Sequence, residues 1–292
     1  MKNLVYATIV LSSYLGIFPA HFAKADEPTK AAPIKAARML MLTQSQGFRH
    51  GSVTRKECKL SPAERAMTEL GIQSGLFRVD CSQDAARDFT EERLKNYDIV
   101  MFYTTGDLPI DEKDLDYFFQ TWLKQKGHGF IGVHSAADTY HNYKPYWDMI
   151  GGTFNGHPWG SGSTVTITVH DTKHPVSRPW GKEVTLKDEI YHFKHWQPEK
   201  VHLLMSLDMA KTRLKKPYLV PIAWVKEYGE GKVMHMSLGH REDIWTNPTY
   251  MESILGGVKW ILGLEEGDAT PNPELSAKLE KLAKQAYDAA QN

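Results

Sequence analysis

The segment DIVMFYTT at residues 98–105 constrains the fold more than any other part of the chain, because it is almost uninterruptedly apolar. A strand with one solvated face alternates apolar and polar residues, whereas a strand covered on both faces of a parallel sheet is apolar throughout. We therefore expect this segment to be a buried strand. Further strands are expected at residues 37–44, 76–81 and 129–134, with helical segments between them.

The segments between these strands carry helix signals. SPAERAMTELGI begins with Ser61 as an N-cap and has Glu64 at the capping-box position, so a helix is expected to start there and to end at Gly71. Residues 91–97 predict a short helix and residues 111–127 an amphipathic one. Strands and helices that alternate through short links predict an α/β fold of the flavodoxin-like, doubly wound type with a mostly parallel central sheet.

The second half of the chain is less regular. Strands are expected at residues 163–170 and 202–208, and a hairpin around the turn at residues 227–231. A closing helix should begin near Pro248, and a polar-rich amphipathic helix should follow Pro273.

The N-terminal segment has the pattern of a secretory signal peptide. Lys2 is followed by an apolar run to about Phe18, and Ala23-Lys24-Ala25 forms an A-x-A cleavage site. The run is shorter than the roughly 20 residues that span a bilayer, which favours cleavage over an anchor. We expect a periplasmic or secreted protein with no membrane insertion after cleavage near Ala25. The predicted organisation is a signal peptide at residues 1–25, a linker at 26–37, one domain at 38–263 and a C-terminal tail with a helix at 264–292.

The charge balance gives no indication of a nucleic-acid partner. The chain has 35 basic and 35 acidic side chains, and cleavage would remove only Lys2 and Lys24, so neither sign dominates. The sequence has no basic stripe of the kind that binds a phosphate backbone. The two cysteines, Cys58 and Cys81, could form a disulfide in an oxidising compartment or stay as two thiols. A pair of cysteines without a neighbouring cluster is poor evidence for a metal site.

Residues 130–139, FIGVHSAADT, have the shape of a nucleophile elbow, in which the central residue is raised on a sharp strand-to-helix turn. Enzymes with this elbow carry Ser or Cys at its centre, whereas this chain carries His134. An imidazole there suits proton transfer or ligation rather than acyl transfer. Ligands of doubly wound sheets bind outside the carboxyl ends of the strands, so the loops after the first, third and fourth strands should meet around His134.

The other candidate residues share a position in a loop or at a strand end. They are His50, His157, His240, Glu189, Asp138, Tyr103 and Tyr191. Aromatic faces with polar handles suit sugar rings, although such residues are also ordinary packing residues. The sequence has no H-E-x-x-H motif, so no cofactor is firmly implied. A divalent metal such as zinc would require residues that are distant in sequence to converge, for example His134 and His157 with Glu189.

Several motifs together resemble the ThuA-like family, which is named for trehalose utilisation and is related to class I glutamine amidotransferases. In chain order they are GFRH, YDIVMFYTTGD, GFIGVHSAADT, IGGTFNGHP, HPV, DEIYHF, PIAWVKEYGEGKVMHMSLGH and GVKWILG. The resemblance covers residues 38–263 and implies an amidotransferase-like α/β sandwich. His134 would stand where the amidotransferase cysteine does, so glutamine hydrolysis through a thioester is not expected. The resemblance also implies a pocket lined by Arg49, His50, His134, Asp138, His157, Glu189 and His240.

These observations lead to the hypothesis of an enzyme of carbohydrate utilisation that acts on a sugar or 3-keto-sugar glycoside by general acid/base chemistry. His134 and Glu189 would exchange protons with the assistance of His240, while Arg49 and His50 would hold substrate oxygens. The other expected substrate contacts are Tyr103, Asp138, His157 and Tyr191. Two alternatives stay open, namely a sugar-binding or accessory protein without catalysis and a zinc-dependent hydrolase. The expected partner is a small carbohydrate, and the sequence leaves oligomerisation open.

Overall fold

The computed structural model describes residues 36–57 and 59–292. The predicted signal peptide, most of the predicted linker and Cys58 lie outside these residues. The leader stays a prediction, and both alternatives for Cys58 and Cys81, a disulfide or two thiols, stay open. In the described part of the chain, no helix combines the length and the apolar character needed to cross a bilayer.

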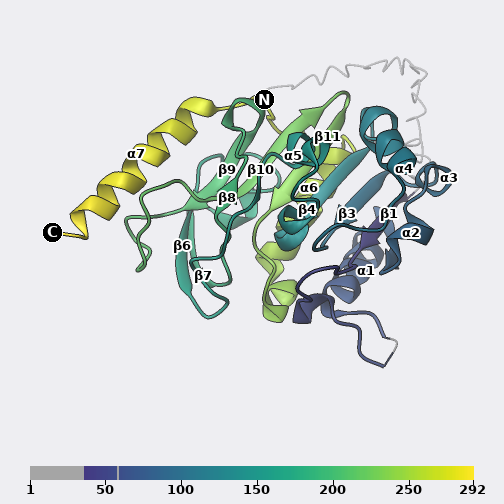
Figure 1. The fold of residues 1–292 in the computed structure, drawn as a ribbon, viewed down its shortest axis with the longest axis horizontal. Helices are drawn as coiled ribbons and strands as arrows, with labels where there is room; N and C mark the ends of the chain where they lie inside the picture. The colour runs from purple at the N-terminus through teal and green to yellow at the C-terminus, as the bar shows by residue number, and fades with distance from the viewer. Residues whose placement is uncertain (1–35, 58) are drawn as a thin grey trace, which may run out of the picture. The chain divides into compact units, whose positions relative to one another are not determined.

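A large mixed sheet forms the centre of the protein (Figure 1). In spatial order its nine strands are β2 (Phe77–Ser82), β1 (Ala37–Leu42), β3 (Ile99–Phe102), β4 (Gly129–Val133), β11 (Gly231–Met236), β10 (Pro221–Tyr228), β9 (His202–Leu207), β6 (Thr164–Val169) and β7 (Glu183–Lys187). The first five strands pair in parallel, and β6 and β10 run opposite to the other seven. The predicted α/β fold with a mostly parallel central sheet is therefore confirmed, and the order β2-β1-β3-β4-β11 is that of flavodoxin-like sheets.

Helices cover both faces of the parallel half of the sheet (Figure 1). One face packs against α1 (Pro62–Ser74) and α6 (Pro248–Ile261). The opposite face packs against α2 (Ala85–Asp88), α3 (Glu91–Leu94), α4 (Glu112–Tyr117) and α5 (Lys144–Ile150). In β1, Met39 and Met41 belong to the first core and Leu40 and Leu42 to the second, because successive strand residues point to opposite faces. All four side chains are buried, as the apolar runs predict.

The boundaries of three predicted helices differ from the structure. The helix predicted at residues 91–97 covers only Glu91–Leu94. Helix α1 continues beyond Gly71 to Ser74, and Gly75, with φ of +68°, ends it. Gly71 has a different role, because a Cβ atom there would lie 2.7 Å from the carbonyl oxygen of Phe77. The helix predicted at residues 111–127 is regular only over α4 and then widens into a π-helical turn at Phe118–Trp122.

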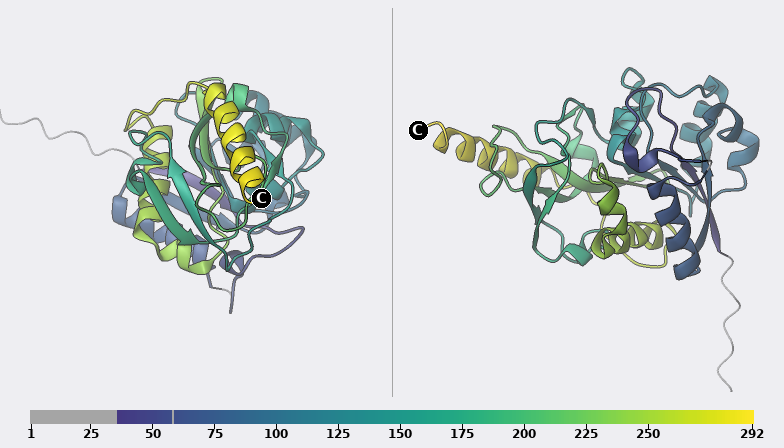
Figure 2. Two further views of the ribbon diagram at one scale, coloured as in Figure 1. Left: turned by 90° about the vertical axis from the view of Figure 1, so that its left-hand side faces the viewer. Right: turned by 90° about the horizontal axis from the view of Figure 1, so that it is seen from below.

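The C-terminal tail folds as predicted into a helix, α7 (Pro273–Ala289), which lies beyond β9, away from α1 (Figure 2). Side-chain hydrogen bonds of Asn272 and Glu280 help attach it to β9 and to the segment before β10. The Asn272 side chain accepts the backbone N–H of Leu203 at 2.8 Å and donates to its carbonyl at 3.2 Å. Glu280 accepts the backbone N–H of Leu219 at 2.6 Å. A separate two-stranded ladder joins β5 (Thr153–Phe154) to β8 (Phe193–Lys194).

Glu64 joins α1 to the loops around it. Its carboxylate accepts two hydrogen bonds of 2.8 Å from Arg55, one of 2.5 Å from the Thr43 hydroxyl and one of 2.9 Å from the Ser61 backbone. The Glu64 side chain is fully buried. Burial acts to raise its pKa, but the hydrogen bonds from Arg55, Thr43 and Ser61 outweigh that effect and lower it.

We predict that Glu64→Ala lowers the free energy of unfolding by about 3 kcal/mol, because it leaves the Arg55 guanidinium and the helix N-cap without their partner. Urea unfolding followed by circular dichroism measures the change. The exposed Glu69→Ala, in the same helix, is the matched control and should change stability by less than about 0.5 kcal/mol. Since the folded-state pKa of Glu64 is depressed, its contribution should be present above pH 4.5 and fade as the pH falls below that value. Equal losses in both variants would contradict the assignment.

Candidate functional site

His134 occupies a strained turn directly after β4. Its φ of +45° lies in the left-handed region, which non-glycine residues adopt only at a cost of about 1–3 kcal/mol. It opens the short 3-10 helix η3 (His134–Asp138), and its side chain is fully buried. The elbow expected from the sequence is therefore present, and it aims an imidazole at the carboxyl edge of the parallel strands.

A backbone carbonyl fixes the orientation of this imidazole. Nδ1 of His134 lies 2.8 Å from the carbonyl oxygen of Ser237, just beyond β11. A carbonyl oxygen only accepts, so Nδ1 carries a proton, and Nε2 is the ring nitrogen left to face the other residues of the site. Nε2 faces Oε2 of Glu189 at 3.5 Å and Nδ1 of His240 at 3.3 Å.

Two further residues complete a compact cluster with His134 and Glu189. His240 follows β11, and its Nδ1 lies 3.0 Å from Oε2 of Glu189. His50, in the loop after β1, places its ring centroid 4.9 Å from those of both His134 and His240. One ligand atom from each of His50, His134, Glu189 and His240 lies within 4.8 Å of the others. We call these four residues the His/Glu cluster.

Buried hydrogen bonds hold the loop that carries His240. Asp188, which is fully buried, accepts the backbone N–H of Gly239 at 2.7 Å and that of Arg241 at 3.1 Å. The Tyr103 hydroxyl donates to the Gly239 carbonyl at 2.8 Å. Gly239 adopts φ of +129°, a conformation that favours glycine. Sequence reasoning selected Glu189 and missed its neighbour Asp188, although the Asp-Glu pair is a local signal for both carboxylates.

Within the cluster, the pKa values of His50 and Glu189 are both shifted downward, for different reasons. Burial, followed by repulsion from His134 and His240, lowers the pKa of His50 to about 2. Burial acts to raise the pKa of Glu189, but the neighbouring imidazoles of His134 and His240 outweigh that effect, and the pKa is lowered. At neutral pH His50 therefore offers a nitrogen lone pair, and Glu189 carries a negative charge.

Other candidate residues surround the cluster. The Tyr191 ring lies 4.3 Å from that of His134. His157 is half exposed, and its Nδ1 lies 3.5 Å from Oε1 of Glu189, the oxygen that faces away from the other imidazoles. Asp138, at the end of η3, bonds to His141 at 2.5 Å. Burial raises the pKa of Asp138 although His141 opposes the shift.

Arg49 and Tyr103, which were expected to contact the substrate, differ from the other candidates in their exposure and hydrogen bonding. Arg49 is exposed, and no hydrogen bond or ion pair joins it to the cluster among the described residues. Tyr103 is fully buried, and its hydroxyl is engaged by Gly239 and by Ser52 at 2.6 Å. Phe48, which the sequence did not single out, is 66% exposed and lies 4.9 Å from the His50 ring.

The donor set of the cluster fits a divalent transition metal. Three imidazoles and one carboxylate suit zinc and its neighbours. Two ligand atoms bound at about 2.0 Å to a tetrahedral ion lie about 3.3 Å apart. In the cluster, Oε2 of Glu189 lies 3.0 Å from Nδ1 of His240 and 3.5 Å from Nε2 of His134, and these two nitrogens are 3.3 Å apart. Nδ1 of His50 is buried without a hydrogen-bond partner. The bond from His134 to a backbone carbonyl is the outer contact that metal-binding histidines commonly make.

Comparison with known proteins gives a consistent family and fold. The family model ThuA, described as trehalose utilisation, matches residues 38–261. A ThuA-like protein from Bacteroides uniformis is 20% identical with a TM-score of 0.62, and the match covers 85% of this chain and 99% of that one. A ThuA-like protein from Parabacteroides merdae is 14% identical with a TM-score of 0.61, over 82% and 99% of the two chains. A cytoplasmic protein from Salmonella typhimurium is 12% identical with a TM-score of 0.52, over 77% and 98%. No curated protein matches the chain.

We predict that Asp188→Asn loosens the loop that carries His240, because an amide cannot accept both backbone N–H groups as the carboxylate does. Amide hydrogen exchange in the peptide that spans residues 238–241 should accelerate, and the free energy of unfolding should fall by about 1–3 kcal/mol. Asp243→Asn is the matched control, since Asp243 lies in the same segment but pairs at the surface with Arg241. Unchanged exchange in Asp188→Asn would show that the loop is held by other contacts.

Proposed function

The chain belongs to the ThuA family, and we propose that it is a divalent-metal-dependent enzyme that acts on a sugar or 3-keto-sugar glycoside. The observation that carries the proposal is the convergence of His50, His134, Glu189 and His240 within 4.8 Å at one edge of the sheet. A buried carboxylate is paired or coordinates a metal, and the groups nearest Glu189 are imidazoles, which are themselves metal ligands. The family's description, trehalose utilisation, supports a carbohydrate substrate.

The four residues of the His/Glu cluster would hold the ion. When bound, the ion supplies Lewis-acid polarisation of a substrate oxygen. His134 contributes Nε2, because its Nδ1 proton is committed to the Ser237 carbonyl. Glu189 contributes Oε2 and leaves Oε1 toward His157. This proposal favours the zinc-dependent alternative over direct proton exchange between His134 and Glu189, since both side chains would serve as ligands.

Proton transfer would then fall to a different pair of residues. Asp138 ends the 3-10 turn that His134 opens, and its carboxylate lies 2.5 Å from Nε2 of His141. Both side chains are partly accessible, at 20% and 32%, whereas that of His134 is fully buried. The pair can take a proton from a carbon beside a 3-keto group and give a proton to the leaving oxygen. These are the proton transfers of an elimination, and their reverse is those of a hydration.

Aromatic rings at the rim would bind the sugar. Phe48 is exposed beside His50. Phe154 lies 4.4 Å from Tyr191 and stacks 6.1 Å from His157. Flat apolar faces next to polar groups suit the C–H face of a pyranose ring. Arg49, which is exposed and adjacent to Phe48 in the sequence, would contact hydroxyl oxygens of a larger substrate. An amidotransferase reaction is not proposed, because the elbow carries His134 in place of a cysteine.

We further propose that the enzyme works outside the cytoplasm, after removal of residues 1–25. The n-region, the apolar run and the A-x-A site support this location. N-terminal sequencing of the protein recovered from the periplasm or medium of an expressing cell should begin at Asp26.

The metal proposal predicts about one ion per chain. Protein purified without chelator, stripped and reloaded with Zn²⁺ or Mn²⁺, should retain one equivalent by elemental analysis after desalting. Glu189→Gln should weaken binding at least about tenfold, because it removes the anionic ligand. The exposed Glu252→Gln is the matched control and should bind like the wild type. Retention of less than a tenth of an equivalent by the wild type, with either ion, would overturn the proposal.

The catalytic proposal predicts different kinetic effects for two rim variants. With a 3-keto-glucoside as substrate, Asp138→Asn should lower kcat at least about a hundredfold with little change in KM. Phe48→Ala should raise KM severalfold with kcat nearly unchanged, because it removes a binding surface alone. Binding of the sugar by the metal-loaded wild type without turnover would instead support the sugar-binding alternative.

A further inference from the structure

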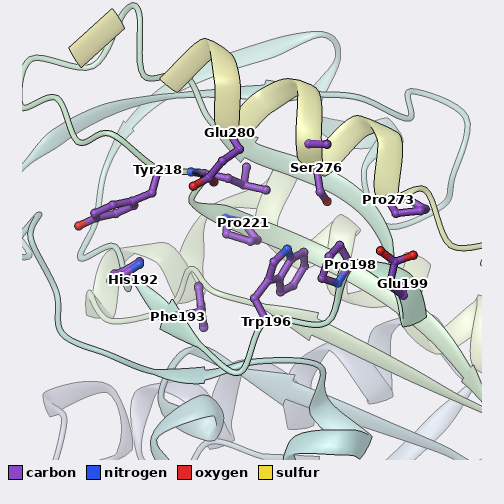
Figure 3. A pocket seen from close by; sticks show the side chains of 12 residues that line it. His192, Phe193, Trp196, Pro198, Glu199, Tyr218, Pro221, Pro273, Ser276 and Glu280 are labelled. Carbon is purple, nitrogen blue, oxygen red and sulfur yellow. Dashed lines mark hydrogen bonds between the residues drawn. The ribbon is translucent and has the colours of Figure 1, made fainter. Parts of the chain in front are cut away.

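We propose that a second cavity, beneath helix α7, binds a neutral sugar independently of the His/Glu cluster. The cavity has a volume of about 420 Å³ and lies between α7 and the segments before β9 and β10 (Figure 3). Its walls include His192, Phe193, Trp196, Tyr218, Ser276 and Glu280. A volume of this size falls in the range of small-ligand sites and exceeds that of one pyranose ring.

Aromatic rings form a flat wall of the cavity. The rings of His192 and Tyr218 stack with centroids 4.0 Å apart and an angle of 22° between their planes. Trp196 lies farther along the cavity, next to Pro198 in Figure 3, and packs edge-on against Trp224 at 5.0 Å. Such a wall matches the apolar C–H face of a sugar ring, and the tight packing of these rings keeps it in place.

Two polar atoms of the wall have no hydrogen-bond partner among the described residues. They are Nε1 of Trp196 and Oγ of Ser276, and both are buried. Ser276 is only 5% exposed, and Figure 3 shows its hydroxyl directed into the cavity. A buried donor without an acceptor costs about 1–3 kcal/mol. The indole N–H only donates, so the ligand must offer an acceptor, which a sugar hydroxyl does and an alkylammonium group does not.

Charge narrows the class of ligand further. Glu199 and Glu280 line the cavity, and no Lys or Arg lines it. Phosphorylated sugars and uronic acids would meet carboxylates without a balancing cation, which disfavours them. A neutral sugar would instead find carboxylate oxygens that accept hydrogen bonds from its hydroxyl groups. Glu280 is already fixed through Oε2 by the backbone of Leu219, so its position does not depend on a ligand.

The cavity and the His/Glu cluster share one stretch of chain. Within residues 188–196, Glu189 belongs to the cluster and Tyr191 packs on His134, while His192 and Trp196 line the cavity. A sugar bound beneath α7 would therefore hold the far end of the segment that supplies the carboxylate. The cavity shares no lining residue with the His/Glu cluster, so sugar binding there does not depend on whether the cluster holds a metal.

Saturation-transfer NMR and calorimetry on the mature, metal-loaded chain test the proposal with glucose, trehalose and glucose 6-phosphate. At least one neutral sugar should bind, and glucose 6-phosphate should bind at least about threefold more weakly than glucose. Trp196→Phe keeps the ring and removes the N–H, so it should raise the Kd about three- to tenfold. Trp147→Phe is the matched control, because the Trp147 indole already donates to the Tyr140 carbonyl outside the cavity.

Ser276→Ala provides a second variant with minimal change in volume, and it should also raise the Kd severalfold. If Trp196→Phe unfolds at a markedly lower temperature than the wild type, Ser276→Ala alone decides the outcome. Metal content measured on each variant shows whether the His/Glu cluster is intact, so failure of this proposal is distinguishable from failure of the metal proposal. The proposal is overturned if no neutral sugar binds, if both variants bind like the wild type, or if glucose 6-phosphate binds most tightly.

Discussion

The parallel pairing of β1, β3, β4 and β11 is the constraint on which the site depends. Parallel strands end at the same edge of a sheet, so the loops that follow them meet even though they are distant in sequence. His50 follows β1, His134 follows β4 and His240 follows β11. Glu189 reaches the same edge from the segment after β7. If one of these strands ran antiparallel, its histidine would lie at the opposite end of the sheet.

Within that edge, hydrogen bonds between side chains and the backbone set the geometry. The Ser237 carbonyl orients His134, and the Asp188 carboxylate orders the backbone on both sides of His240. The strained φ of His134 is tolerated because β4 and the Ser237 contact hold the residue from both sides. The imidazoles and the carboxylate are therefore directed toward one another before any ligand arrives, which is the preorganisation that a metal or catalytic site requires.

Much of the fold could be predicted from the sequence because its signals are local. The apolar run of β3 and the capping box at Ser61 each depend on a few neighbouring residues. The end of α1 could not be predicted from the sequence, because Gly71 does not end the helix. It allows the helix to lie close to the Phe77 carbonyl, a contact that only the folded chain reveals. For the site, the histidines at strand ends could be recognised in the sequence. The sequence could not show that His50, rather than His157, joins His134, Glu189 and His240 as a potential ligand, because this depends on long-range packing. The support from Asp188 was missed because its partners lie about 50 residues away.

The central claim is that His50, His134, Glu189 and His240 form one metal centre. X-ray absorption at the zinc edge of the reloaded protein tests it most directly, because imidazole rings give a distinctive multiple-scattering signal. The account predicts a first shell of nitrogen and oxygen at about 2.0 Å with scattering from three imidazoles, reduced to two in His50→Ala. A first shell with sulfur, or a spectrum that His50→Ala and His134→Ala leave unchanged, would contradict it.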